Sequence, residues 1–124
     1  MIDFQNSKIF KLSPVDNKTF AASVSPMLVP DEHIYKSFQT IRDGVVFTNK
    51  RIITINHQKL TGIKVDYTSL PYSKIQAYSV ETAGHWDLDS ELELWFSGLG
   101  NVKLEFLANT DILDICGMIS MYVL

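Results

Sequence analysis

Three histidines are the side chains of this 124-residue chain that most readily exchange protons near neutral pH. His33, His57 and His85 are well separated along the sequence, and each stands in a turn or at the end of an expected strand. This spacing puts no two of them on one face of an element. We therefore expect exposed loop histidines, with a catalytic or metal-binding role as the alternative.

An acidic motif offers oxygen ligands of the kind that calcium and magnesium prefer. Asp87, Asp89 and Glu91 follow a D-x-D-x-E spacing. An EF-hand loop counted from Asp87 would need glycine at its sixth position and glutamate at its twelfth, where this chain has Leu92 and Gly98. The pattern therefore favours the charged outer edge of a hairpin, and no metal is expected.

The chain contains one cysteine that could act as a nucleophile. Cys116 lies on the apolar stripe of an expected helix, which favours a buried structural thiol over a reactive one. The chain has no glycine-rich phosphate loop, no nucleophile elbow and no paired-cysteine zinc spacing. We expect no catalytic residue and no cofactor, and so a protein that is not an enzyme.

Basic residues beside the turns of neighbouring expected strands are candidates for anion contact, and they are Lys50, Arg51, Lys59 and Lys64. They could form a cup for an anionic headgroup, although solvated strand ends are the favoured interpretation. Over the whole chain, 11 Lys and Arg face 14 Asp and Glu, a net charge of −3. This acidic balance disfavours a nucleic-acid partner.

Charge is distributed unevenly along the sequence. Residues 1–78 hold ten basic and six acidic residues, a balance of +4, whereas residues 79–124 hold one basic and eight acidic residues, a balance of −7. Surfaces of opposite sign on one domain can attract a second copy head to tail.

The segment 1–32 is predicted to be an extension of strand and helix that packs on a domain of residues 33–124. Ser13 is suited to cap a helix with Pro14 at its first position. Phe20 and Val24 would share one face of this helix, and Pro26 should end it near Val24.

In residues 33–106, apolar and polar residues alternate with a period of two, which predicts about seven short antiparallel strands. The expected strands are 34–41, 45–48, 51–55, 63–68, 75–80, 92–96 and 102–106. In the last two, Lys103 could pair with Glu91 or Glu93 across a hairpin. Trp95 points outward among these acids, which indicates either a contact surface or packing under the N-terminal helix.

A final helix, capped by Asn109 or Thr110, closes the chain. Its core stripe consists of Ile112, Ile115, Cys116, Ile119 and Val123. Leu113, Met118 and Met121 fall elsewhere around the cylinder, which is more apolar surface than one contact face requires. Trp95, Met118 and Met121 are therefore the candidate interface residues. The whole predicts an α+β, mainly β fold in which a helix plugs a bent sheet or partial barrel.

Membrane insertion is not expected. The longest uncharged stretch, residues 115–124, is half of the roughly 20 residues that a spanning helix needs, and residues 1–10 lack a signal-peptide apolar run. These features predict a cytoplasmic protein.

Long stretches of the chain resemble the bacterial pleckstrin-homology-like (bPH) family. They are RD-x-x-VFTNKR at residues 42–51, the run 64–75, and SVETAG-x-x-DLD at residues 79–89, so the resemblance covers about residues 33–124. It implies a bent antiparallel barrel of seven strands with a C-terminal helical cap, and ring-forming homo-oligomers joined edge to edge. The chain departs from the family after Gln58, where Lys59 replaces a common glycine and Ile63 a lysine.

The resemblance does not carry phosphoinositide binding with it. Eukaryotic pleckstrin-homology domains that bind these lipids have a basic cluster across the first hairpin, whereas here Arg42 is alone and next to Asp43. We expect a non-catalytic, self-assembling interaction or scaffold module. The alternative is a membrane-surface module that binds anionic lipid headgroups through Lys50, Arg51, Lys59 and Lys64.

Overall fold

The computed structural model describes residues 1, 11–57 and 64–124. One open sheet has the strand order β5-β4-β3-β2-β1-β8-β7-β6. The strands are β1 (Lys11–Val15), β2 (Ile34–Gln39), β3 (Gly44–Thr48), β4 (Arg51–His57), β5 (Val65–Pro71), β6 (Ile75–Glu81), β7 (Ser90–Phe96) and β8 (Gly100–Phe106). The helices are α1 (Lys18–Val24), α2 (Ile112–Val123) and the short 3₁₀ turns η2 (Ser25–Met27) and η3 (Tyr72–Lys74).

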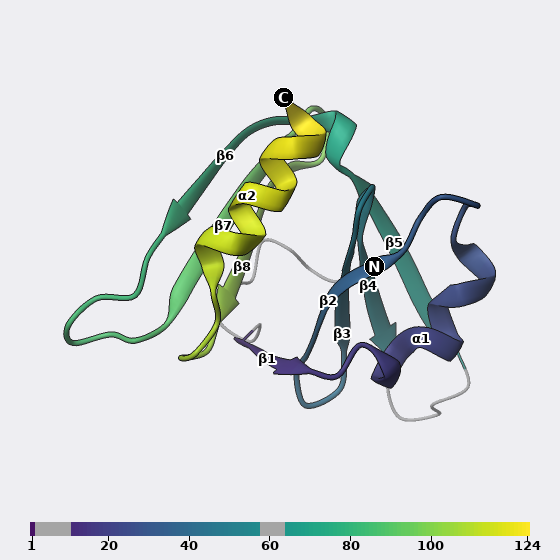
Figure 1. The fold of residues 1–124 in the computed structure, drawn as a ribbon, viewed down its shortest axis with the longest axis horizontal. Coiled ribbons are helices and arrows are strands. Elements are labelled where there is room, and N and C mark those ends of the chain that lie inside the picture. Colours follow the sequence, from purple (N-terminus) through teal and green to yellow (C-terminus); the bar gives the residue numbers. More distant parts are fainter. Residues whose placement is uncertain (2–10, 58–63) are drawn as a thin grey trace.

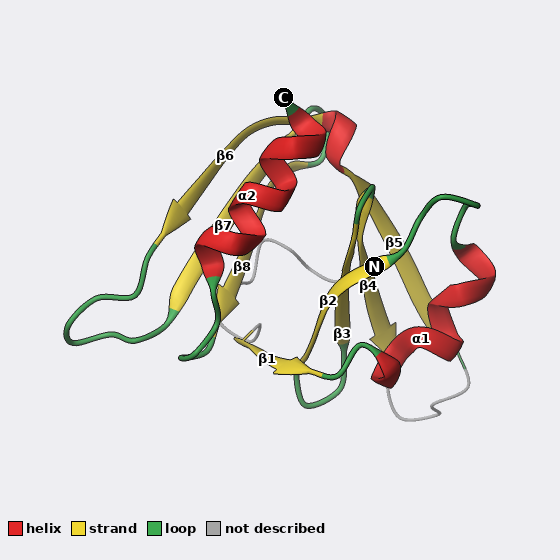
Figure 2. Cartoon of the chain, viewed as in Figure 1, coloured by secondary structure: helices red, strands yellow, loops and turns green. Residues whose placement is uncertain are grey.

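The sheet bends into two halves that β1 joins (Figure 1). Pro14 of β1 lies opposite Phe38 of β2 in an antiparallel pair, and Lys11 lies opposite Glu105 of β8 in a parallel pair. Helix α2 crosses the open side of the half formed by β6, β7 and β8, and α1 lies at the far end of the other half (Figure 2). The expected mainly β fold with a C-terminal helical cap is confirmed, with eight strands in an unclosed sheet in place of about seven.

Strand β1 corrects the predicted start of the N-terminal helix. Ser13 and Pro14 do not begin a helix, because residues 11–15 form β1 and its Leu12 is fully buried in the core. Pairing with β8 stops at Leu12, so the missing N–H of Pro14 is tolerated at this position. The helix begins at Lys18, whose backbone N–H donates to Asp16 Oδ1 at 2.8 Å.

The remaining expectations for α1 are confirmed. The α-helix ends at Val24, and Pro26 lies in the 3₁₀ turn η2 that follows. Val24 is buried with Val46 and Ile53 in a second, smaller core, and Phe20 packs against the same cluster. This helix therefore covers residues of β3 and β4. The boundary at residue 32 stays a prediction.

The main core lies between the bent sheet and α2. Helix α2 contributes Ile112, Ile115, Met118 and Ile119. The predicted cap is wrong by one or two residues: Asp111, not Asn109 or Thr110, caps the helix, because its Oδ1 accepts the Asp114 backbone N–H at 3.1 Å. Within the described part of the chain, neither α-helix has the length and apolar character needed to cross a bilayer.

Candidate functional site

Arg51, a predicted anion-contact residue, is committed to an internal network. Its Nε lies 2.9 Å from Glu32 Oε2, and its Nη2 lies 3.0 Å from Glu32 Oε1. The guanidinium also donates to Ser69 Oγ at 3.0 Å and to the Met27 carbonyl at 2.7 Å. Because these donors form hydrogen bonds inside the protein, Arg51 stabilises the fold and does not face outward to bind an anion.

Glu32 is the buried partner that makes this network strong. Its side chain is almost fully covered and also accepts hydrogen bonds from Thr48 Oγ1 at 2.6 Å and from the Val29 backbone N–H at 3.1 Å. Burial acts to raise the pKa of Glu32, but the hydrogen bonds from Arg51 and Thr48 prevail and lower this pKa below its ordinary value.

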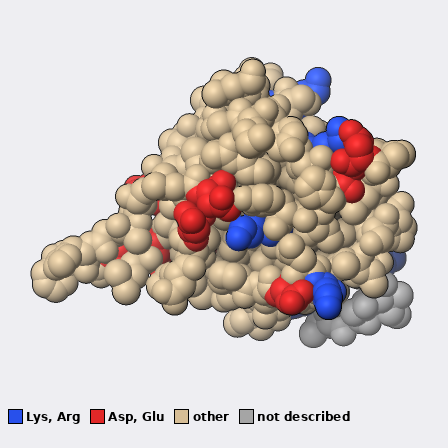
Figure 3. Space-filling view, in the orientation of Figure 1, with Lys and Arg blue, Asp and Glu red and all other residues tan. Residues whose placement is uncertain are grey.

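The other predicted anion contacts do not form a cup with Arg51. Lys50 Nζ lies 3.3 Å from Asp31 Oδ2 in an exposed pair, and Lys64 is exposed. Lys59 lies outside the described residues, as does Ile63, the other position after Gln58 at which the chain departs from the family. Lys50 and Arg51 are thus both compensated by carboxylates, which weakens their attraction for an anion. Figure 3 shows acidic and basic side chains scattered in small groups on one face, with no broad basic patch there.

The residues considered for chemistry remain dispersed. His33, His57 and His85 are exposed, as predicted, whereas Cys116, which was predicted to be buried, is half-buried. In the acidic motif, Asp89 pairs with Lys11 at 3.4 Å. Among residues 1, 11–57 and 64–124, no three His, Cys, Asp or Glu side chains form a group that could hold a metal ion.

The hairpin pairing expected for Lys103 is present. Its Nζ lies 3.5 Å from Glu91 Oε1, across the ladder of β7 and β8. Glu93, the alternative partner, instead accepts a hydrogen bond from the Asn101 side chain at 2.7 Å.

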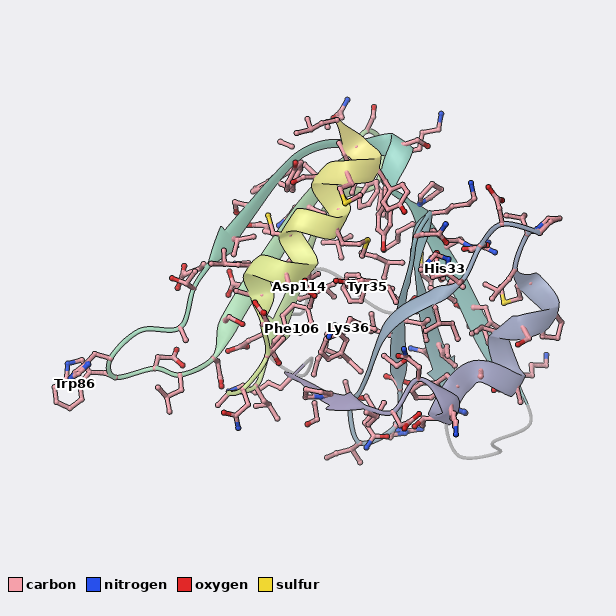
Figure 4. The ribbon with its side chains drawn as sticks, viewed as in Figure 1. His33, Tyr35, Lys36, Trp86, Phe106 and Asp114 are labelled. Carbon is pink, nitrogen blue, oxygen red and sulfur yellow. The ribbon has the colours of Figure 1, made fainter. Side chains whose placement is uncertain are left out.

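A groove of about 480 Å³ opens between α2 and the start of β2. Leu113, Gly117 and Met121 come from the helix, and His33 and Tyr35 come from the strand side. Figure 4 shows Tyr35 and Asp114 approaching each other across this space, where the Tyr35 hydroxyl donates to Asp114 Oδ2 at 2.5 Å. This hydrogen bond raises the pKa of Tyr35 and fixes the width of the groove at one point.

The candidate interface residues lie at different depths. Met121 is 76% exposed at the rim of the groove, whereas Met118 is only 6% exposed and belongs to the core that forms its floor. Trp95, which is 36% exposed, alternates with the buried Leu94 and Phe96 of β7. It therefore points away from the core-facing side of the sheet on which α2 packs. The fold brings the two methionines together and leaves Trp95 on another surface.

Sequence reasoning missed the most exposed aromatic residue in the part of the chain that the structure describes. Trp86 is 95% exposed in the loop 82–89 between β6 and β7, and Figure 4 shows it at the tip, far from His33 and Tyr35. The available signal was an aromatic residue in a segment without alternation, next to Asp87, where no strand could bury it.

Gly117 gives a first test of the helix face that borders the groove. A Cβ added at this position would meet nothing within 4 Å. We expect Gly117→Ala to raise the free energy of unfolding by about 0.5–1 kcal/mol, because alanine loses less conformational entropy in a helix. Chemical denaturation of dilute protein measures this change.

Gly98 is the matched control for that substitution. It also has open space around it, but its φ of +83° disfavours any residue with a Cβ, so Gly98→Ala should be destabilising. A loss of stability for Gly117→Ala would contradict the open helix face.

Comparisons with known proteins agree with this architecture. The family model described as "Bacterial PH domain" matches residues 3–123. The uncharacterized protein YjqA of Bacillus subtilis (strain 168) is 44% identical over 91 residues, which cover 72% of this chain and 73% of YjqA. The family description names a domain, and neither it nor the name of YjqA assigns a reaction.

Two crystal structures from Shewanella species are similar in fold and sequence. A DUF1696 family protein with a pleckstrin-homology domain from Shewanella loihica PV-4 has a TM-score of 0.79 and 38% identity, covering 93% of this chain and 99% of that one. A pleckstrin homology domain from Shewanella amazonensis SB2B has a TM-score of 0.65 and 42% identity, covering 89% and 90%.

Proposed function

This chain belongs to the bacterial PH domain family, and we propose that it is a non-catalytic module that assembles with copies of itself and offers the assembled surface to a protein partner. The observation that carries this proposal is the open sheet. Among the residues that the structure describes, its terminal strands, β5 and β6, each pair with a neighbour on one side only, and each leaves a row of backbone donors and acceptors on the other.

The two free edges are different surfaces, which supports head-to-tail addition. Edge strand β5 follows the exposed Lys64, whereas β6 ends at Glu81 and continues into the acidic loop 82–89. A contact between unlike surfaces repeats from copy to copy and closes into a ring when its rotation permits. The excess of acid in residues 79–124 and of base in residues 1–78 favours the same arrangement.

Light scattering coupled to gel filtration tests this proposal. At micromolar concentration we expect a mass several times the 14.1 kDa of one chain, with partial dissociation as salt screens the charges. A 14.1 kDa species throughout, at low and moderate salt, would overturn the proposal. Flotation with acidic liposomes tests the membrane-surface alternative, for which binding should weaken as salt is raised.

A further inference from the structure

The loop 82–89 projects from the domain, is held in shape by hydrogen bonds, and has an apolar side chain at its tip. The Gly84 backbone N–H donates to the Asp87 carbonyl at 2.7 Å, and the Asp89 N–H donates to Asp87 Oδ1 at 3.0 Å. Lys11 pairs with Asp89 at the base of the loop. At the tip, the rings of Trp86 and His85 are arranged edge to face, with their centroids 5.7 Å apart. A large aromatic side chain held out into water in this way has the character of an interface anchor.

The α2–β2 groove matches such an anchor in size and chemistry. Its volume of about 480 Å³ is within the range of pockets that enclose a small ligand. Leu113 and Met121 supply apolar walls, and methionine sulfur makes favourable contacts with aromatic rings. Because Gly117 has no side chain, there is room between Leu113 and Met121. The Asp114 carboxylate lines the groove and can accept the indole N–H.

The tip of the loop cannot reach the groove of its own chain. Figure 1 shows the loop between β6 and β7 extending away from the body of the domain, whereas the groove lies between α2 and β2. A projection and a recess on different parts of one molecule give a heterologous contact between two copies.

Charge complementarity favours a second copy over a membrane as the occupant. The loop and the end of β6 carry Glu81, Asp87 and Asp89, and the chain has no Lys or Arg between Lys74 and Lys103. The Lys36 ammonium lies outside the lining of the groove, 5.7 Å from the centre of the Tyr35 ring, and Tyr35 itself lines the groove. Lys36 forms no ion pair with any residue that the structure describes. An acidic loop would be repelled by anionic lipid, whereas Lys36 beside the groove attracts it and offsets the negative charge of Asp114 inside the groove.

The groove also adjoins a free edge of the sheet. Tyr122 lines both the groove and a neighbouring depression of about 380 Å³ that includes Pro71, the last residue of edge strand β5. The loop, in turn, continues directly from edge strand β6. The loop 82–89 and the α2–β2 groove therefore lie beside β6 and β5, the two edge strands that we propose for assembly.

We propose that Trp86 of one copy inserts into the α2–β2 groove of the next and provides the anchor of the head-to-tail contact. This inference rests on the proposed self-assembly, whose contact it specifies.

Two variants separate the projection from the recess. Trp86→Ala removes the anchor and keeps the groove, whereas Gly117→Leu fills the groove and keeps the anchor. Each should raise the protein concentration at half-assembly by at least about tenfold, the effect of losing an interface hot spot. Circular dichroism and thermal unfolding verify that both variants are folded. If Gly117→Leu folds poorly, Leu113→Asp at the exposed wall of the groove replaces it.

Mixing the two variants gives the decisive measurement. One retains only a groove and the other only an anchor, so the mixture should form a one-to-one dimer of 28 kDa, about twice the chain mass, and extend no further. A mixture that stays monomeric would overturn the inference. Trp95→Phe is the matched aromatic control and should assemble as the wild type does.

The fluorescence of Trp86 supplies an independent readout. In the Trp95→Phe background, Trp86 is the sole tryptophan. Its emission should shift to shorter wavelength as the protein concentration is raised through assembly. An unshifted emission, or a shift that requires lipid vesicles, would overturn the inference.

The wild type separates the two proposals. A monomeric wild type refutes self-assembly itself. An assembled wild type whose mass is unaffected by Trp86→Ala refutes only the anchor.

Discussion

Arg51→Ala is expected to lower the free energy of unfolding by about 3–5 kcal/mol at neutral pH, the usual cost of removing one partner from a buried ion pair. The substitution deletes the hydrogen bonds to both oxygens of Glu32 and strands that carboxylate in a site that water barely reaches. It also leaves the Met27 carbonyl and Ser69 without the donors they now have. Denaturant unfolding at pH 7 measures the loss. Since small domains are stable by about 5–15 kcal/mol, the variant could approach the limit of folding.

The pH dependence of this loss identifies Glu32 as its origin. In the wild type, the pKa of Glu32 is lowered on folding, so the associated stability is present above the ordinary pKa of about 4.3 and is lost as pH falls through the folded pKa. In Arg51→Ala, burial acts without its main counterweight and the pKa of Glu32 should rise. The stability gap between wild type and variant should therefore be widest near pH 7 and narrow towards pH 4. A gap that is constant with pH would contradict an electrostatic origin.

Lys50→Ala is the matched control, because it removes the adjacent cation in the sequence. The Lys50 pair with Asp31 is exposed on both sides, so its loss should cost about 0–1 kcal/mol. Arg51→Lys keeps the positive charge but cannot reproduce the four hydrogen bonds of the guanidinium, and we expect it to recover only part of the stability. Equal losses for Lys50→Ala and Arg51→Ala would contradict the assignment of Arg51 to the fold.

Arg51 also shows where sequence reasoning reaches its limit. Its position in a basic turn suggested anion contact, and nothing local distinguishes it from Lys50. What distinguishes the two is Glu32, which lies 19 positions away and is buried only after β2 and β3 have paired. Burial of a charge is a property of tertiary packing, so period and composition could not reveal it.

The sequence pattern was sufficient to predict a strand where apolar and polar residues alternate, because one face of such a strand must be buried. The alternation in residues 92–96 and 102–106 predicted β7 and β8, including the Lys103–Glu91 pair. At residues 11–15, the residue types at two positions favoured a helix, whereas tertiary packing favoured a strand. Ser13 and Pro14 have the types that begin a helix, but the burial of Leu12 between the halves of the sheet prevailed.

The candidate contact surface was predicted in part. The surplus of apolar residues on the last helix indicated an exposed stripe, and Leu113 and Met121 form it. Helical spacing predicted that Met118 lies outside the core stripe, which is wrong, because the actual rotation of the helix turns it into the core. Trp86 escaped notice because exposure at a loop tip depends on how far the strands carry the loop from the domain.

Phe106→Ala is expected to lower the free energy of unfolding by about 3–5 kcal/mol, as other deletions of a large buried aromatic ring do. Phe106 of β8 is fully buried and meets Phe38 of β2 edge to face at 4.9 Å, with Phe47 of β3 at 6.2 Å. These rings face each other across the short strand β1, for which the described part of the chain shows two residues, Lys11 and Leu12, paired with β8. The aromatic contacts therefore hold together the two halves of the sheet where the ladder of hydrogen bonds is weakest.

Two variants show whether the ring itself is responsible for that loss. Phe106→Leu keeps most of the apolar volume and should cost less than Phe106→Ala. Ile41→Ala removes a fully exposed apolar side chain and should change stability by no more than about 0.5 kcal/mol. Hydrogen exchange adds a spatial readout, because a weakened junction should let amides of β1 and β8 exchange earlier than those of β3 and β4. If Phe106→Ala cost no more than Ile41→Ala, the backbone pairing of β1 would have to hold the two halves together without the aromatic cluster.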